Sequence, residues 1–317
     1  MKMIRKFFNI AALMLGAVAM DSCQMIQDSI STSESVTVTF NVQTECNTKA
    51  IADASNIDIL YWQVFDKDVE TAASPMATGV VRDSDGDGMF TLDLSLILDQ
   101  TYNFIFWAQE EQPVGAEHYD VTDLRRVGIV SYDDELANDE GRAAFFAHKE
   151  LHVTGPIYQP VILYRPFAQL NLGTSTYDVS SLNNMTPLKV NYSEVTVSGV
   201  AEVFNTLTGK GEGRKEVRFQ KNQTPNGEDD ALYQMLEVNE QTYYWLGMNY
   251  LIVNEDLDNV SVDMILYTTH GDVQINVPNV PIKENHRTNI IGDLLTSEAV
   301  FEVVLDDVFV DPDFIVE

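Results

Sequence analysis

Cysteine is nearly absent from this chain. Cys23 and Cys46 are the only two among its 317 residues, and two cysteines cannot form the disulfide framework that holds small secreted domains together. Stability must therefore come from buried apolar surface. About 290 residues would remain after loss of a leader, which is enough for one large or two ordinary domains.

Positive charge is also scarce. The chain has 19 Lys and Arg against 49 Asp and Glu, which gives a net charge of −30. Binding to nucleic acid depends on cations that neutralise phosphates, so this composition excludes nucleic acid as a partner. An acidic surface also disfavours adsorption to anionic lipid, and we therefore expect contact with a membrane through a lipid anchor only.

The apolar run that opens the chain is too short to cross a membrane. It extends from Phe7 to about Met20, behind the positive charges of Lys2, Arg5 and Lys6. As a helix it would be about 21 Å long, against roughly 30 Å for the hydrocarbon core of a bilayer. Residues 1–22 are therefore predicted to be a cleaved signal peptide.

The residues at the end of this run resemble the lipobox of bacterial lipoproteins, in which a cysteine is acylated and becomes the new N-terminus. Cys23 follows Ser22 in the expected way, although Met20-Asp21 departs from the usual pattern. We predict lipidation of Cys23 and a lipid-proximal tether at residues 23–34, which are rich in polar residues. A plain secretory signal with an incidental cysteine is the alternative.

Helical periodicity is scarce, and alternation with a period of two takes its place. Val36, Val38, Phe40 and Val42 fall on one face of an extended chain, as expected of a half-buried strand. The same alternation marks residues 57–65, 102–107, 260–266 and 273–277, and the last two ranges are predicted to form a hairpin.

Short strands with few helices predict an all-β fold built from β-sandwiches. The alternation is interrupted at Gly155-Pro156 and Gln159-Pro160. This break predicts an N-terminal β-sandwich at residues 35–158 and a C-terminal one at residues 159–317.

Signatures of catalysis are missing. The sequence has no Gly-x-Ser-x-Gly nucleophile elbow and no phosphate-binding loop. His148 and His152 have the spacing of a helical zinc pair, but Lys149 stands where a zinc peptidase needs glutamate, and the following residues favour an extended chain. We therefore expect no enzymatic activity and no cofactor. A hydrolase that uses two of the many carboxylates is the least favoured alternative.

One acidic loop has half of a calcium-binding pattern. Asp83, Asp85 and Asp87 occupy the first, third and fifth positions of such a loop, with glycine at the sixth, but Leu94 stands where the final glutamate should be. The loop is a weak calcium candidate. A tight turn in a hairpin, between residues 80–81 and 90–92, explains the glycines without an ion.

Aromatic clusters could stack on sugars. They contain Trp62, Trp107 and Trp245. Aromatic residues in strands are more often part of a core, so a sugar-binding platform is the alternative interpretation.

Several stretches together resemble the fimbrillin-type surface lipoproteins of Bacteroides and its relatives, and the resemblance covers nearly the whole mature chain. Its strength lies in the order of the motifs, since none of them is decisive alone. They are residues 49–53 (KAIAD) with 60–62 (LYW), 104–109 (FIFWAQ), 136–140 (LANDE) with 144–146 (AFF), 165–171 (RPFAQLN) and 285–296 (NHRTNIIGDLLT).

The resemblance implies two transthyretin-like β-sandwich domains in tandem and assembly by strand complementation. In fimbrillins, a protease removes the first strand, and a C-terminal strand of a neighbouring subunit fills the groove that opens. Lys49 is the implied cleavage site. The implied displaced strand carries Val36, Val38, Phe40 and Val42, and the implied donor strand carries Phe301, Val303 and Leu305.

One departure from the family pattern bears on this mechanism. Fimbrillin processing favours arginine, and no arginine occurs between Cys23 and Arg82. A chain that keeps its first strand would be a closed monomer, an anchor or a terminal subunit.

The predicted function is a structural or adhesive component of cell-surface fimbriae, located at the outer membrane as a lipoprotein. Its partners would be other fimbrial subunits, or surface ligands of host or bacterial cells. A non-catalytic, glycan-binding surface lipoprotein is the alternative.

Overall fold

The structure is a computed structural model, and it describes residues 34–44, 56–83, 86–130, 135–175, 190–222, 235–295 and 299–306. From Glu34 onward the chain forms one compact unit. Strands make up nearly all of the regular structure in the described ranges, which also contain one short 3-10 helix, η1 (Glu140–Arg142). The predicted all-β class is therefore confirmed. No helix in the described ranges is long and apolar enough to cross a membrane.

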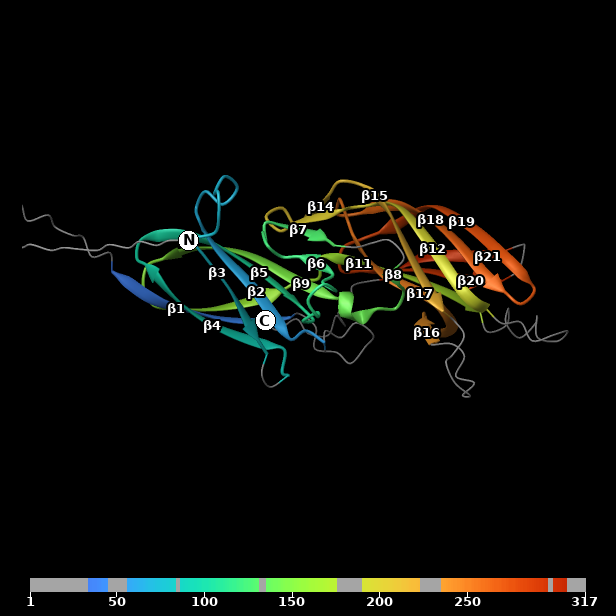
Figure 1. Ribbon diagram of the computed structural model, residues 1–317, viewed down its shortest axis with the longest axis horizontal. Helices are drawn as coiled ribbons and strands as arrows, with labels where there is room; N and C mark the ends of the chain where they lie inside the picture. The colour runs from blue at the N-terminus through green and yellow to red at the C-terminus, as the bar shows by residue number, and fades with distance from the viewer. Residues whose placement is uncertain are drawn as a thin grey trace, which may run out of the picture. The chain divides into compact units, whose positions relative to one another are not determined.

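Two sheets contain most of the strands from the first half of the chain. The first sheet has the order β10 (Ile157–Leu163), β1 (Ser35–Thr44), β4 (Met89–Ile97), and the second has the order β3 (Ala77–Arg82), β2 (Ile59–Asp66), β5 (Gln100–Gln109), β9 (Ala144–Val153). Figure 1 shows β1 and β4 side by side.

Two larger sheets follow. One has the order β16 (Met235–Val238), β17 (Gln241–Ile252), β11 (Phe167–Ser175), β20 (Arg287–Asp293), β21 (Val300–Leu305). The other has the order β19 (Gly271–Ile282), β18 (Asp258–Thr268), β12 (Val190–Val200), β15 (Lys215–Asn222), β8 (Glu135–Leu136). A small sheet has the order β14 (Lys210–Glu212), β13 (Val203–Asn205), β7 (Arg126–Ile129), β6 (Tyr119–Asp120).

The alternation of apolar residues decides which face of each strand is buried. On β1, Val38, Phe40 and Val42 are fully buried, while Thr37 and Gln43 are exposed. The ring of Phe40 lies 4.6 Å from that of Phe104 on β5 and 5.5 Å from that of Phe106 on β5, measured between centroids. The first two sheets therefore pack face to face, as in a β-sandwich.

A second cluster of buried apolar residues lies between the two larger sheets. Leu170 and Leu172 of β11 and Leu246 of β17 supply one side, and Val195 and Val197 of β12 supply the other. The predicted hairpin is confirmed as β18 and β19, which pair from Asp258↔Ile282 to Thr268↔Gly271. At its turn the Thr268 hydroxyl donates to the Gly271 carbonyl.

The strand pairing crosses the predicted domain boundary at several points. β10 spans residues 158 and 159, and its pairing with β1 from Val38↔Ile157 to Thr44↔Leu163 keeps the whole strand in the first sheet. β7 pairs with β13, and β8 pairs with β15. The division into two tandem domains stays a prediction, and the pairing of β10 favours an end of the first sandwich after Leu163.

The central position of β1 leads to a prediction about stability. Phe40→Ala should lower the free energy of unfolding by about 3–5 kcal/mol, because it removes a fully buried ring from between two sheets. Thr37→Ala, on the exposed face of the same strand, should cost less than about 1 kcal/mol. Urea unfolding of the two variants measures the difference, and similar midpoints would show that β1 contributes little to the core.

Candidate functional site

The candidate site is the slot that β1 occupies between β4 and β10. β1 pairs with β4 in antiparallel register from Ser35↔Ile97 to Gln43↔Met89, and with β10 in parallel register. Although β1 is the first described strand, it is the central strand of its sheet. Its backbone donors and acceptors are therefore engaged on both sides, which makes it part of the sheet rather than an added edge.

Removal of β1 would expose both polar and apolar groups. Neighbouring strands lie roughly 4.8 Å apart, so β4 and β10 would be left about 10 Å apart with unpaired edges that face each other. The apolar floor beneath Val38, Phe40 and Val42 would also lose its cover. Burial of three such side chains stabilises by roughly 5–8 kcal/mol in total, so the empty slot would bind an apolar strand strongly.

Three of the predicted site residues, among them Asp85 of the acidic loop, lie outside the described part of the chain. Cys23 precedes the first described residue, and Lys49 lies between the described residues 44 and 56. Lipidation of Cys23 and cleavage at Lys49 therefore stay predictions. The displaced-strand residues Val36, Val38, Phe40 and Val42 all belong to β1, and Val36 is only partly buried.

The predicted donor residues belong to β21, which is an edge strand. β21 pairs with β20 from Asp293↔Val300 to Thr288↔Leu305. Phe301, Val303 and Leu305 alternate on β21 and are partly buried, and the first two pack against the second core cluster. In this conformation β21 therefore completes its own sheet.

A close backbone approach fixes β21 against β20 at Gly292. This residue has φ +146°, and a Cβ built there would lie 2.3 Å from the carbonyl oxygen of Val300 and 2.7 Å from the Cα of Phe301. Both contacts are with backbone, so they cannot be relieved by a side-chain rotation. Only glycine allows the two strands to pair at this point.

The acidic loop differs from the predicted hairpin. β3 pairs with β2 and β4 pairs with β1, so the loop between β3 and β4 crosses from one sheet to another, and the hairpin prediction is wrong. The Asp83 carboxylate accepts hydrogen bonds from the backbone N–H groups of Gly86 and Gly88, at 2.8 and 2.7 Å. Asp87 accepts from the Met89 N–H, and Asp85 lies outside the described residues.

The loop geometry therefore has a physical cause that needs no ion, because backbone donors already use both oxygens of Asp83. Among the described residues, no group of three or more His, Cys, Asp or Glu side chains is arranged to hold a metal. Calcium binding at Asp83, Asp85 and Asp87 stays untested.

The two spaced histidines lie on a strand, as the sequence predicted. His148 and His152 both belong to β9, and each contacts a residue of β5. The His148 Nε2 lies 2.8 Å from the Asn103 Oδ1, and the His152 Nδ1 lies 3.1 Å from the Thr101 hydroxyl. Burial lowers the pKa of His148. These partners give both imidazoles a structural role in the sheet.

The tryptophans do not form a common platform. Trp107 is completely buried and Trp245 is 4% exposed, so the favoured prediction that these aromatic residues belong to a core is confirmed, and the alternative of an exposed platform fails at these two positions. Trp62 on β2 is partly exposed and lies across Gly79 of β3, where a Cβ would be 2.5 Å from the indole ring. Trp62 is thus the one tryptophan of the three that solvent reaches appreciably.

Sequence reasoning missed a buried cation. The Arg165 side chain is 1% exposed, and its guanidinium carbon lies 4.6 Å from the centroid of the Phe145 ring and 5.4 Å from that of Tyr250. The Tyr250 hydroxyl donates to Glu140 of η1 at 2.8 Å, and burial raises the pKa of Tyr250. This cluster joins η1, β9 and β17. The motif at residues 165–171 contains the arginine, but only the fold shows the aromatic rings around it.

Comparison with known proteins gives a family and a fold. Residues 29–316 match the profile of a family of unknown function, DUF6562. No curated protein matches the chain. Among solved structures, a proposed polysaccharide-binding protein (DUF1812) from Bacteroides thetaiotaomicron is 13% identical, with a TM-score of 0.51 over 86% of this chain and 96% of that chain. At this level of identity the similarity shows a common fold.

Two other solved structures are similar at lower scores. A fimbrial assembly protein from Parabacteroides distasonis is 12% identical, with a TM-score of 0.45 over 86% of this chain and 99% of that chain. The tip fimbrial protein Mfa3 from Porphyromonas gingivalis, with a C-terminal truncation, is 12% identical, with a TM-score of 0.44 over 86% of this chain and 99% of that chain.

The contact at Gly292 yields a prediction about β21. Gly292→Ala should loosen β21 from β20, because the new methyl group meets backbone atoms. Amide exchange at residues 300–305 should then become at least tenfold faster while exchange in β1 is unchanged. Gly155→Ala is the matched control, since a Cβ at Gly155 meets nothing within 4 Å. Equal exchange in both variants would show that Gly292 does not control the docking of β21.

Proposed function

Because this chain belongs to DUF6562, a family of unknown function, its role must be argued from its structure, and we propose that it is a structural or adhesive subunit of cell-surface fimbriae. In this proposal the subunits assemble by strand complementation at the slot of β1. The observation that carries it is the position of β1, the first described strand, at the centre of its sheet with Val38, Phe40 and Val42 fully buried.

The connectivity of the chain supports this role for β1. Every residue of β1 precedes Lys49, and the next described strand, β2, begins at Ile59. Cleavage at Lys49 would therefore separate β1 from the rest of the protein without cutting any other described strand. The released strand would leave a slot with two sheet edges and an apolar floor, which is the geometry that strand addition requires.

The donor strand in this proposal is β21 of another copy. Phe301, Val303 and Leu305 repeat with the same period as Val38, Phe40 and Val42, so three alternate apolar side chains can replace three. β21 lies at the edge of its sheet and pairs with β20 on one side within the described residues. Its transfer would require separation from β20 and loss of the contacts that Phe301 and Val303 make with the second core cluster.

The N-terminal residues bear on where in the cell the protein is located. A chain acylated at Cys23 would be held at the outer membrane with its sandwiches facing outward, and its net charge of −30 would keep it from adsorbing to anionic lipid. We propose no catalytic activity for this chain. Its partners would be other fimbrial subunits.

Proteolysis of the full chain tests the proposal. Digestion with a lysine-specific protease should release a peptide that ends at Lys49, and the trimmed protein should then form a ladder of oligomers in mass photometry. A synthetic peptide of residues 35–49 in tenfold excess should block the ladder, because it refills the slot. Val303→Asp should also block it, since a charge would enter the apolar floor.

Two controls make the result specific. Glu302→Gln changes the exposed residue next to Val303 and should leave the ladder intact. Lys49→Gln should prevent both release of the peptide and oligomer formation. Trimmed protein that remains monomeric, or oligomers that form equally well with Val303→Asp, would contradict strand complementation by β21.

A further inference from the structure

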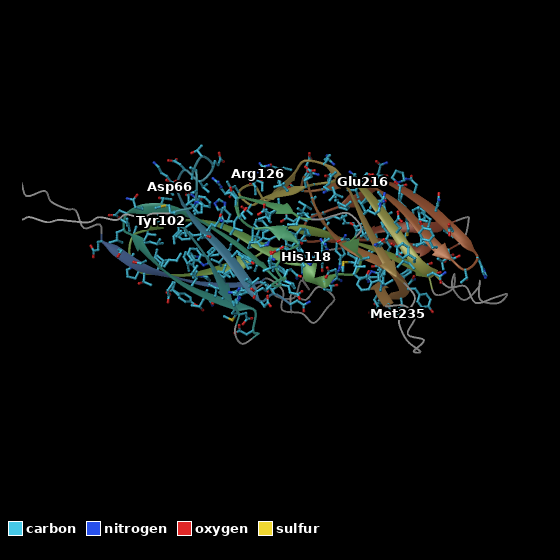
Figure 2. All side chains as sticks on the ribbon, viewed as in Figure 1. Asp66, Tyr102, His118, Arg126, Glu216 and Met235 are labelled. Carbon is cyan, nitrogen blue, oxygen red and sulfur yellow. The ribbon has the colours of Figure 1, made fainter. Side chains whose placement is uncertain are left out.

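A cavity on the five-stranded sheet that contains β11 has no part in the proposed assembly. Its volume is about 390 Å³, which lies within the roughly 300–1,000 Å³ of small-molecule sites. Its walls come from four strands of one sheet, so its geometry is set by paired backbone rather than by a loop. Its lining includes Gln169 and Asn171 of β11, Trp245 of β17, Arg287 of β20, and Met235 and Glu237 of β16. Met235 is labelled in Figure 2.

Three lining residues each contain a buried polar atom without a hydrogen-bond partner. These atoms are the Gln169 Nε2, the Asn171 Oδ1 and the Trp245 Nε1. The three residues are between 1% and 4% exposed. A buried polar group without a partner costs about 1–3 kcal/mol, and native structures rarely gather several in one wall. The cluster therefore points to a ligand that supplies the missing partners.

A ladder of hydrogen bonds fixes which atom Asn171 presents. The Asp306 carboxylate accepts a hydrogen bond from the Asn289 Nδ2 at 2.7 Å, and it has no proton to donate. The Asn289 Oδ1 in turn accepts a hydrogen bond from the Asn171 Nδ2 at 2.8 Å. Because the ladder begins at an acceptor, the amide orientations follow, and the acceptor Oδ1 is the atom that Asn171 has left to offer.

The cavity therefore offers donors and an acceptor together. The Trp245 indole N–H can only donate, and the Asn171 Oδ1 can only accept. Hydroxyl groups do both, and a ring with several hydroxyl groups presents both on neighbouring atoms. The side chains of Trp245 and Leu236, which share one face of the sheet, add apolar surface beside these polar atoms, which suits the C–H faces of such a ring.

The charge of the cavity lining and of the whole chain bears on whether the ligand is a neutral or an acidic polyhydroxyl ring. The charged residues in the lining are Arg287 and Glu237, whose formal charges cancel. The chain as a whole has a net charge of −30, which disfavours the approach of an anion. We propose that this cavity binds one residue of a neutral saccharide, whose hydroxyl groups donate to Asn171 and accept from Gln169 and Trp245.

This site is separate from the slot of β1, so the two proposals can fail independently. The test uses the full, uncut chain and a panel of neutral sugars: glucose, galactose, mannose, N-acetylglucosamine and their β-linked disaccharides. Glucuronic acid serves as the acidic probe. Saturation-transfer NMR detects binding, and titration gives the dissociation constant. At least one neutral sugar should bind, and glucuronic acid should bind at least tenfold more weakly.

Two variants remove the donors. Gln169→Met and Trp245→Phe should each weaken binding at least tenfold, which corresponds to the loss of one hydrogen bond. The melting temperature of Gln169→Met should stay equal or rise, since this variant removes a buried polar atom that has no partner in the free protein. Trp245→Phe also removes buried ring atoms, so its melting temperature should fall. Gln274→Met on β19 and Trp62→Phe on β2 make the same changes away from the cavity and should leave binding unchanged.

The outcomes that overturn the proposal are distinct. They are the absence of binding by every neutral sugar in the panel, tighter binding of glucuronic acid, or unchanged affinity in both cavity variants. If neither cavity variant folds, Leu236→Phe decides, because Leu236 lines the cavity on the same face of the sheet as Trp245 and a larger side chain there would fill part of the cavity. Binding to that variant with undiminished affinity also overturns the proposal.

Discussion

The pairing of β1 on both of its edges is the interaction on which the first sandwich depends. A central strand satisfies the backbone groups of two neighbours as well as its own, so its loss would leave two ladders open. β1 reaches this position from the start of the described chain, and its parallel partner β10 lies far along the sequence. The sheet is therefore complete only when distant parts of the chain have met, which is the expensive step in forming such a topology.

Local patterns in the sequence predicted the strands well but not their partners. The alternation of Val38, Phe40 and Val42 gave both the strand and its buried face, and the β18–β19 hairpin followed from two alternating runs and a short turn. The connection between β3 and β4 has the same local features, but it crosses between sheets. Alternation shows that a strand has two unlike faces, and it carries no information about which strand lies beside it.

The polar residues of β11 show a second limit of prediction from sequence, which concerns burial. Gln169 and Asn171 alternate with Leu170 and Leu172, a pattern that predicts one face on the core and one face in water. The structure buries both faces, and Gln169 and Asn171 become hydrogen-bonding groups in a cavity wall. The sequence favoured a core position for Trp245, and the structure buries it, but its position in the same wall, with an indole N–H that has no partner, could not be predicted. Burial of this kind depends on tertiary packing, so no signal in the strand itself could have shown it.

The positions of β1 and β21 bear on the direction of the proposed assembly. β21 is paired with β20 alone within the described residues, and its side chains are partly buried, whereas a strand in the slot of β1 pairs on two sides and has three fully buried side chains. Transfer of β21 from its edge to the slot of another copy would therefore exchange one ladder for two and increase apolar burial. While β1 occupies the slot, β21 of another copy cannot enter it, so the proposed cleavage at Lys49 would act as the switch. The free energy that favours assembly would come from the difference in pairing and burial between the edge position of β21 and the slot of β1.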